Sequence, residues 1–346
     1  MIWLVTGMSL VTLLIFPEQC RTGGTNGVFL CIQVLIPSLF PFMVLSSFIV
    51  CSGLSSKVPS WAGSLTQVIF GLPKDSFAVI ILSLIGGYPV GAKGINSLYK
   101  EGRISAKQAE RMAMFCVASG PGFLVTYTGC SMLGSKQTGY ILLVSQVLTF
   151  IALGVIARFA VQKEVESEEK VNGNIHKRTG NALVVSVSEA IRACGFMCAL
   201  VVLFGAVCEI YLYITEGVPT LRFITAVLEI TNGIKFLAEG YSVVLISAMC
   251  GFGGICVHFQ IFTMLGEIRI SKVKFYIFRV AGGLLNALFT CILLRIFPQT
   301  QGVFSTVNKT QPAFNKGITG CVFLIICCVV FLASIKSANI KPRKSR

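Results

Sequence analysis

Charged side chains are scarce in this sequence. Asp, Glu, Lys and Arg make up 12% of its 346 residues, hydrophobic residues make up 54%, and the mean hydropathy is +0.81. Soluble domains carry about 25% charged residues, so this composition excludes an ordinary soluble globular domain. We expect an all-α polytopic membrane protein, because long apolar stretches of this kind cross membranes as helices.

The sequence also has few of the residues that perform catalysis or bind metals. It contains two histidines, and it has no nucleophile elbow, no Walker loop and no cluster of acidic and histidine metal ligands. Its 14 cysteines lie mostly within apolar segments, where a free thiol packs as a small hydrophobic side chain. We therefore expect no enzymatic activity, no cofactor and no bound metal.

Acidic residues are particularly few, so the net charge is +15. The basic residues stand in short loops and in the tail 336–346, which is typical of the cytosolic side of a membrane protein. This distribution favours membrane lipids over nucleic acid as the partner of the positive charge. The tail is accordingly expected to be cytosolic.

Apolar stretches of about the length of a membrane span recur along the chain. They cover residues 2–16, 28–50, 77–98, 112–134, 138–161, 183–213, 241–265, 275–297 and 317–335. The first lacks a basic start and a small-residue cleavage site, so we expect it to be retained. The predicted organisation is an N-terminal span and loop (1–27), a first repeat (28–161), a polar linker (162–181), a second repeat (182–335) and the basic tail (336–346).

Two of these apolar stretches are interrupted by glycine. Gly86-Gly87-Tyr88-Pro89 breaks the first, and Gly251-Phe252-Gly253-Gly254 breaks the second. A similar loop follows each break, KEGRIS at 100–105 and GEIRIS at 266–271. Ser105 and Ser271 are expected to be the N-caps of the next helices. The ordered matches predict an internal repeat with a solute site between its halves.

The sequence leaves the direction of the repeat open. If the segments 77–98 and 241–265 both cross the membrane, both basic loops are cytosolic and the repeats are parallel, which the charge distribution favours. If both segments are re-entrant hairpins, the repeats are inverted and one basic loop lies outside.

Candidate substrate-binding residues lie at or beside the breaks in the apolar stretches. They are Gly86, Gly87, Tyr88, Pro89, Lys93, Ser119, Gly120, Pro121, Glu229, Thr231, Asn232, Gly253, Gly254, His258 and Gln260. Unwound backbone at membrane depth is tolerated only where it is buried in protein or lines a hydrated cavity. These residues are therefore predicted to line a solute path.

Each of these residues also has a structural interpretation. The glycines would allow close helix packing, Lys93 would extend to the membrane surface, and Glu229 would stand at a helix end beside the capping residues Asn232 and Gly233. His258 would be hydrogen-bonded within the bundle. Glu189 and Arg192, one turn apart, are expected to form an ion pair.

Several runs resemble the sporulation integral membrane protein YlbJ family. The most specific is IGGYPVGAK at 85–93, and it is accompanied by LYKEGRIS at 98–105, AER at 109–111, SGP at 119–121 and LEITNG at 228–233. The likeness covers nearly the whole chain and is weakest in the first span, the linker and the tail. The chain departs from many family members at 116–119, where CVAS replaces an asparagine-rich segment.

The resemblance has implications for both fold and function. The family is similar to proteins with nucleoside-recognition or Gate domains, which share the plan of concentrative nucleoside transporters. This implies two inverted copies of a unit made of a hairpin, a broken helix and a plain helix. It also implies a role in spore formation, with dipicolinate as the cargo.

The residues and the resemblance together predict a sporulation transporter. It would move a small polar, anionic metabolite, most simply dipicolinate, across the cell membrane or the forespore membrane. A nucleoside-like solute is the first alternative. The second is a non-transporting scaffold with other sporulation membrane proteins as partners.

Overall fold

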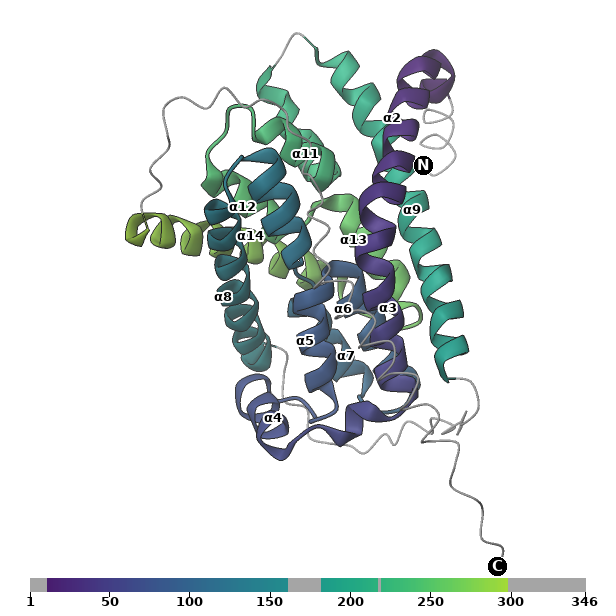
Figure 1. Cartoon of the computed structure of the whole chain (residues 1–346), viewed down its shortest axis with the longest axis vertical. Helices are drawn as coiled ribbons and strands as arrows, with labels where there is room; N and C mark the ends of the chain where they lie inside the picture. The colour runs from purple at the N-terminus through teal and green to yellow at the C-terminus, as the bar shows by residue number, and fades with distance from the viewer. Residues whose placement is uncertain (1–10, 161–181, 217–218, 298–346) are drawn as a thin grey trace, which may run out of the picture. The chain divides into compact units, whose positions relative to one another are not determined.

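The computed structural model describes residues 11–160, 182–216 and 219–297 (Figure 1). These residues are largely helical and contain no β-strand, which confirms the predicted all-α class. The beginning of the first apolar stretch, the linker 162–181, the stretch 317–335 and the basic tail all lie outside the described residues. The predictions made for them stay predictions.

Four helical segments of the described chain are long and apolar enough to cross a membrane. They are α8 (Lys136–Ala160), α9 (Ala182–Ile214), the pair α12 and α13 (together Val243–Leu265) and α14 (Lys272–Ile296). A bent pair near the N-terminus makes a fifth if it is counted as one span. The chain is therefore a multi-pass membrane protein.

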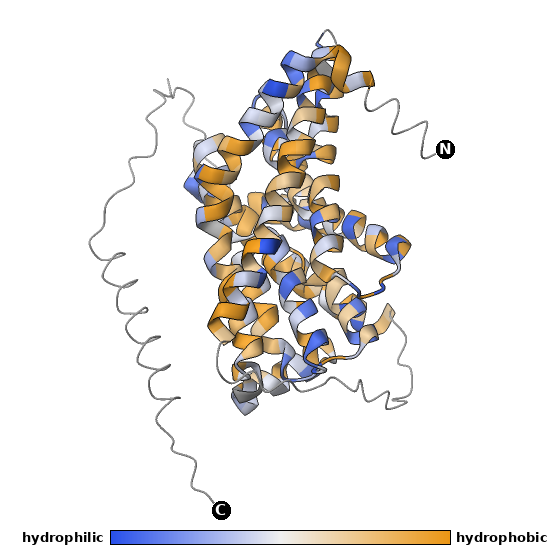
Figure 2. Cartoon of the chain, turned by 90° about the vertical axis from the view of Figure 1, so that its right-hand side faces the viewer, coloured by the Kyte–Doolittle hydropathy of each residue, from blue (hydrophilic) through white to orange (hydrophobic). Residues whose placement is uncertain are grey.

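The outer helices expose apolar stripes, as a lipid-facing surface requires. On α14 the stripe follows a spacing of four residues, and on α8 it follows spacings of four and three. Its residues are Val280, Leu284, Leu288 and Ile292 on α14 and Val144, Leu148, Ile151 and Val155 on α8. Figure 2 shows that hydrophobic residues predominate along most of the helices. In water such exposed apolar stripes would promote aggregation, whereas in a bilayer they contact the hydrocarbon core.

The N-terminal bent pair packs against α9 (Figure 1). It consists of α2 (Pro17–Leu30), the π-helix η1 (Cys31–Leu35) and α3 (Ile36–Cys51). Glycines on α2 permit the close approach, since a Cβ at Gly27 would lie 2.9 Å from the Val202 Cα. The connection to the next helix contains η2 (Leu54–Lys57), α4 (Ser60–Leu65) and the π-helix η3 (Thr66–Phe70).

The segment 77–98 forms a hairpin that turns at Gly87. Its arms are α5 (Ser76–Gly86) and α6 (Tyr88–Lys100). The arms pack side by side, because a Cβ at Gly91 would lie 2.8 Å from the Ser83 Cβ and one at Gly94 would lie 2.7 Å from a Val79 methyl. Gly87 has a φ of 85°, which glycine adopts without the steric cost paid by other residues.

A broken helix follows the hairpin. It contains α7 (Ala106–Phe115), a break at 116–121 in which only Pro121 is helical, and the π-helix η4 (Gly122–Met132), and it leads into α8. Ser105 begins α7 in a capping box with Gln108, which confirms the predicted N-cap.

The second half contains another hairpin and another broken helix. After η5 (Pro219–Arg222), the hairpin arms are α10 (Phe223–Leu228) and α11 (Ile230–Leu237), and a Cβ at Gly233 would overlap the Ala226 Cα across them. The broken span consists of α12 (Val243–Phe252) and α13 (Gly254–Leu265), separated by Gly253. The predicted N-cap Ser271 then begins α14 and accepts from the Lys274 N–H.

Each half of the described chain therefore contains a hairpin, a broken helix and a plain helix in that order, while the internal repeat that the resemblance implies stays a prediction. However, the predicted correspondence of the two glycine breaks is wrong, because Gly87 turns a hairpin whereas Gly253 interrupts a span. In element order, the Gly87 tip corresponds to the Glu229 tip, and Gly253 corresponds to the segment 116–121. Inverted symmetry between the halves stays a prediction.

The two basic loops lie at the same end of the molecule. The Asn96 side chain donates to the Met264 carbonyl, and the Ser271 N–H donates to the Glu110 carboxylate. The loops KEGRIS and GEIRIS therefore lie at one end of the molecule, and each ends in the N-cap of the following helix. Their likeness does not mark equivalent positions of a repeat.

A buried polar network joins α8, α12 and α14. Asn286 donates to the Ser247 carbonyl at 2.8 Å, and Thr290 links the Ser145 and Ser247 hydroxyls at 2.8 and 2.6 Å. Thr149 donates to the Asn286 side chain. Hydrogen bonds of this kind hold helices together where lipid offers no hydrophobic driving force.

Candidate functional site

The tip of the first hairpin packs directly on the break in the following helix. A Cβ at Gly120 would lie 3.0 Å from the Ile85 carbonyl and 3.2 Å from the Gly87 nitrogen. A Cβ at Gly87 would in turn lie 3.3 Å from the Gly120 nitrogen and 3.7 Å from the Ala118 carbonyl oxygen. Two stretches of non-helical backbone are therefore in contact at the centre of the bundle.

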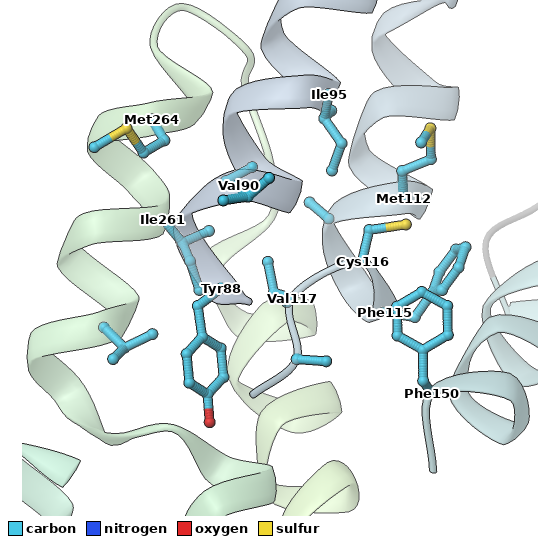
Figure 3. Close-up of a cluster of buried hydrophobic side chains, with 14 of the residues drawn as sticks. Tyr88, Val90, Ile95, Met112, Phe115, Cys116, Val117, Phe150, Ile261 and Met264 are labelled. Carbon is cyan, nitrogen blue, oxygen red and sulfur yellow. The ribbon is translucent and has the colours of Figure 1, made fainter. Parts of the chain in front are cut away.

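Tyr88 connects these two breaks to a third. Its hydroxyl contacts both the Ser119 hydroxyl and the Cys250 carbonyl, and Ser119 lies 3.2 Å from the same carbonyl. The ring fills the space that a side chain at Gly253 would need, 3.1 Å from that Cβ position. Figure 3 shows the Tyr88 ring beside Val117, with its hydroxyl directed away from the aliphatic residues Val90 and Ile261.

The tip of the second hairpin joins the same cluster. Glu229 is 2% exposed, and its carboxylate accepts from the Thr231 and Asn232 N–H groups at 3.0 and 2.7 Å. A Cβ at Gly254 would lie 3.2 Å from the Ile230 nitrogen. The Tyr127 hydroxyl donates to the Thr231 carbonyl at 2.7 Å, which ties this tip to η4.

Four helix N-termini consequently meet in one place, those of α6, η4, α11 and α13. A helix N-terminus carries unpaired N–H groups and the positive end of the helix dipole. Only α11 has a side-chain cap, the Glu229 carboxylate, whereas α6, η4 and α13 have none. The cluster is suited to an anionic group.

Most of the predicted site residues lie in this cluster. They are Gly86, Gly87, Tyr88, Pro89, Ser119, Gly120, Pro121, Glu229, Thr231, Asn232, Gly253 and Gly254. Apart from Pro121 and Asn232, which are half-buried, all are buried. Their role in substrate binding stays a prediction, while their convergence is a property of the fold.

Lys93 lies on α6, away from the hairpin tip, and is not a free cation. Its Nζ is 2.6 Å from the Glu189 carboxylate on α9, and the two side chains are 9% and 32% exposed. The expected ion pair between Glu189 and Arg192 is therefore wrong. Binding of an anion to Lys93, as predicted, would have to displace Glu189.

His258 and Gln260 serve the local structure of α13. The His258 Nε2 lies 2.9 Å from the Phe252 carbonyl, which the break at Gly253 leaves without a helical partner, and its ring packs edge-on against Phe252 and Phe275. Gln260 donates to the Cys256 sulfur one turn earlier. These contacts agree with the structural interpretation of His258.

The sequence interpretation did not select Arg279, which lies on α14 beside the first broken helix. Its guanidinium donates to the Val117 carbonyl at 2.6 Å and to the Met114 carbonyl, and the side chain is 2% exposed. The available signal was an arginine inside an apolar stretch, since charges within spans are rare and usually functional. A single sequence could not distinguish it from the surface cations Lys272 and Lys274.

The fold and the site define a multi-pass α-helical membrane protein with two hairpin tips meeting two broken helices. The chain is similar to the sporulation integral membrane protein YlbJ of Bacillus subtilis (strain 168), with 24% identity over 358 aligned residues. The alignment covers 88% of this chain and 87% of that protein. The predicted resemblance to the YlbJ family is thereby confirmed. No family model matches the chain, and no solved structure does.

Proposed function

We propose that this protein is a membrane transporter with its solute site where the four breaks meet. The observation that carries the proposal is their convergence around Tyr88, Ser119 and Gly253. Each break interrupts the backbone hydrogen bonding that makes a helix stable in lipid, so four breaks in one place are costly. Half-helix ends assembled at the membrane midplane are the usual construction of a solute site in secondary transporters.

The proposed substrate is a small polar, anionic metabolite. The uncapped N-termini of α6, η4 and α13 would stabilise negative charge, each by about 0.3–1 kcal/mol or more when buried. Tyr88 and Ser119 supply hydroxyl groups at the same place. We propose transport and not catalysis, because helix breaks that meet inside a membrane protein are the usual construction of a solute site.

Dipicolinate is the specific substrate that we propose, with the forespore membrane or the cell membrane as the location. The support is the name of the relative, which describes a sporulation membrane protein, together with the planar dianionic character of dipicolinate. Its two carboxylates would suit helix N-termini, and its ring would suit Tyr88. Other sporulation membrane proteins and lipids are proposed as partners.

Proteoliposomes loaded with the purified chain test the proposal directly. We expect uptake of labelled dipicolinate above that of empty liposomes, and its loss in Gly87→Val, whose side chain would press on the backbone of the 116–121 segment. Uridine is tested in parallel. Uptake of uridine alone would replace the anionic substrate with a nucleoside-like one, and absence of both uptakes by correctly inserted protein would favour the scaffold.

A further inference from the structure

Arg279 combines deep burial with an incomplete set of hydrogen bonds. A guanidinium carries five N–H donors. Here Nη1 donates to Val117, Nη2 donates to Met114, and Nε, which is buried, has no partner. Within the described ranges, no Asp or Glu forms an ion pair with this side chain.

This arrangement leaves a positive charge uncompensated inside the bundle. A buried charge without a counter-ion costs several kcal/mol, and two carbonyl acceptors do not neutralise it. The Phe275 ring, 5.5 Å from the guanidinium carbon, supplies a cation–π contact, which is worth about 0.5–2 kcal/mol. Lys93 differs, because the Glu189 carboxylate already balances it.

The charge also lies next to the converging breaks. Val117, which accepts from Nη1, is two residues before Ser119, and Ser119 contacts the Tyr88 hydroxyl. The uncapped π-helix η4 begins at Gly122, which follows the 116–121 segment in the sequence.

We propose that Arg279 binds a carboxylate group of the solute. The unused N–H groups of its guanidinium would receive that carboxylate beside the segment that leads into the uncapped N-terminus of η4. Arginine suits this task because its planar fork matches a carboxylate. The inference rests on the proposed function and specifies which residue selects for negative charge, a role predicted above for Lys93.

The structural alternative is that Arg279 only holds the end of α7. Arg279→Gln distinguishes the two roles, because the amide still donates to a carbonyl but has no charge. Arg111→Gln is the matched control. Arg111 lies in the middle of α7, donates to a backbone carbonyl, that of Gly71 at 2.5 Å, and has an unpartnered Nε, but its carbonyl partner lies outside the cluster where the breaks meet.

Binding is measured on the purified full chain with pyridine-2,6-dicarboxylate, pyridine-2-carboxylate and the uncharged pyridine-2,6-dicarboxamide. We expect the wild type to prefer the dianion. Arg279→Gln should weaken dianion binding at least tenfold, as expected for a charge-assisted hydrogen bond, and leave diamide binding unchanged. Arg111→Gln should keep the wild-type order.

The outcomes separate the inference from the proposed function. If Arg279→Gln keeps the preference for the dianion, Arg279 has only a structural role and the inference is wrong, while the transporter proposal stands. If the wild type binds neither carboxylate, the inference and the proposed anionic substrate are both wrong, and uptake of uridine then decides whether the transporter proposal stands. Should Arg279→Gln fail to fold, Arg279→Lys serves instead. It retains the charge without the fork, so unchanged dianion affinity in that variant would also overturn the inference.

Discussion

At the scale of single residues, partners distant in sequence decide what each charge does. Lys93 and Glu189 are 96 residues apart, and the sequence around each residue does not indicate that the other is its partner. The glycine breaks and the caps Ser105 and Ser271 depend on local chemistry, and the sequence was sufficient to predict them. The burial of Arg279 and the pairing of Lys93 with Glu189 depend on packing between helices that are distant in sequence. No short sequence pattern specifies that packing.

The Lys93–Glu189 pair supports an asymmetric prediction. Removing the Glu189 charge leaves a lysine without a partner, and that lysine side chain is only 9% exposed. Removing the Lys93 charge leaves a carboxylate without a partner, and that side chain is 32% exposed. Because stranding the more buried charge costs more, Glu189→Gln should lower the unfolding temperature of the purified protein further than Lys93→Gln. Thermal unfolding in one detergent compares the two variants.

A control for this prediction is the double variant Lys93→Gln with Glu189→Gln. It leaves no charge unpaired, so its unfolding temperature should exceed that of Glu189→Gln alone. Equal unfolding temperatures for the two single variants would show that the burial difference has no energetic consequence.

At the scale of elements, the two hairpins depend on close contact between their arms. Gly233 lies against the Ala226 backbone, with no room for a Cβ, whereas Gly240 in the following turn has nothing within 4 Å. Gly233→Ala should therefore destabilise the protein, by about 1–3 kcal/mol for overpacking of this kind. Gly240→Ala should be neutral or slightly stabilising.

Chemical denaturation of the two alanine variants checks this difference. Alanine normally favours helix over glycine, so propensity alone would make Gly233→Ala the more stable variant. A stabilised Gly233→Ala protein would mean that the α10 and α11 arms are not packed as described.

At the scale of elements, the sequence does not distinguish a hairpin turn from an interrupted span. Glycine patterns locate breaks in helices, but a hairpin turn and an interrupted span both need glycine. What separates them is the packing of Ser83 against Gly91, which no local pattern specifies. Treating the similar loops 100–105 and 266–271 as equivalent positions gives a false register for the repeat. The two loops lie at the same end of the molecule, and each ends in the N-cap of a helix.

At the scale of the whole molecule, the corrected register predicts a definite topology. The loops 100–105 and 266–271 share one end, and the span Val243–Leu265 places the turn before α12 at the other. Cysteines introduced at Lys100 and Glu267 should therefore be labelled from the same side, and one at Glu239 from the opposite side. All three positions are exposed.

An impermeant thiol reagent applied to sealed vesicles of one orientation provides the measurement, in a background without the exposed native Cys130. By the distribution of positive charge, Lys100 and Glu267 should face the cytosol. Labelling of all three from one side would contradict the assignment of α12 and α13 as a single span.

The short hairpin arms constrain the order in which the protein is built. The arms α5 and α6 have 11 and 13 residues, and α10 and α11 have 6 and 8, whereas a helix held by lipid alone needs about 20 apolar residues. Neither hairpin can lodge in the bilayer by itself during synthesis. Each hairpin needs neighbouring helices around it, so we expect the cluster of breaks, where the solute site is proposed, to form after those helices have inserted.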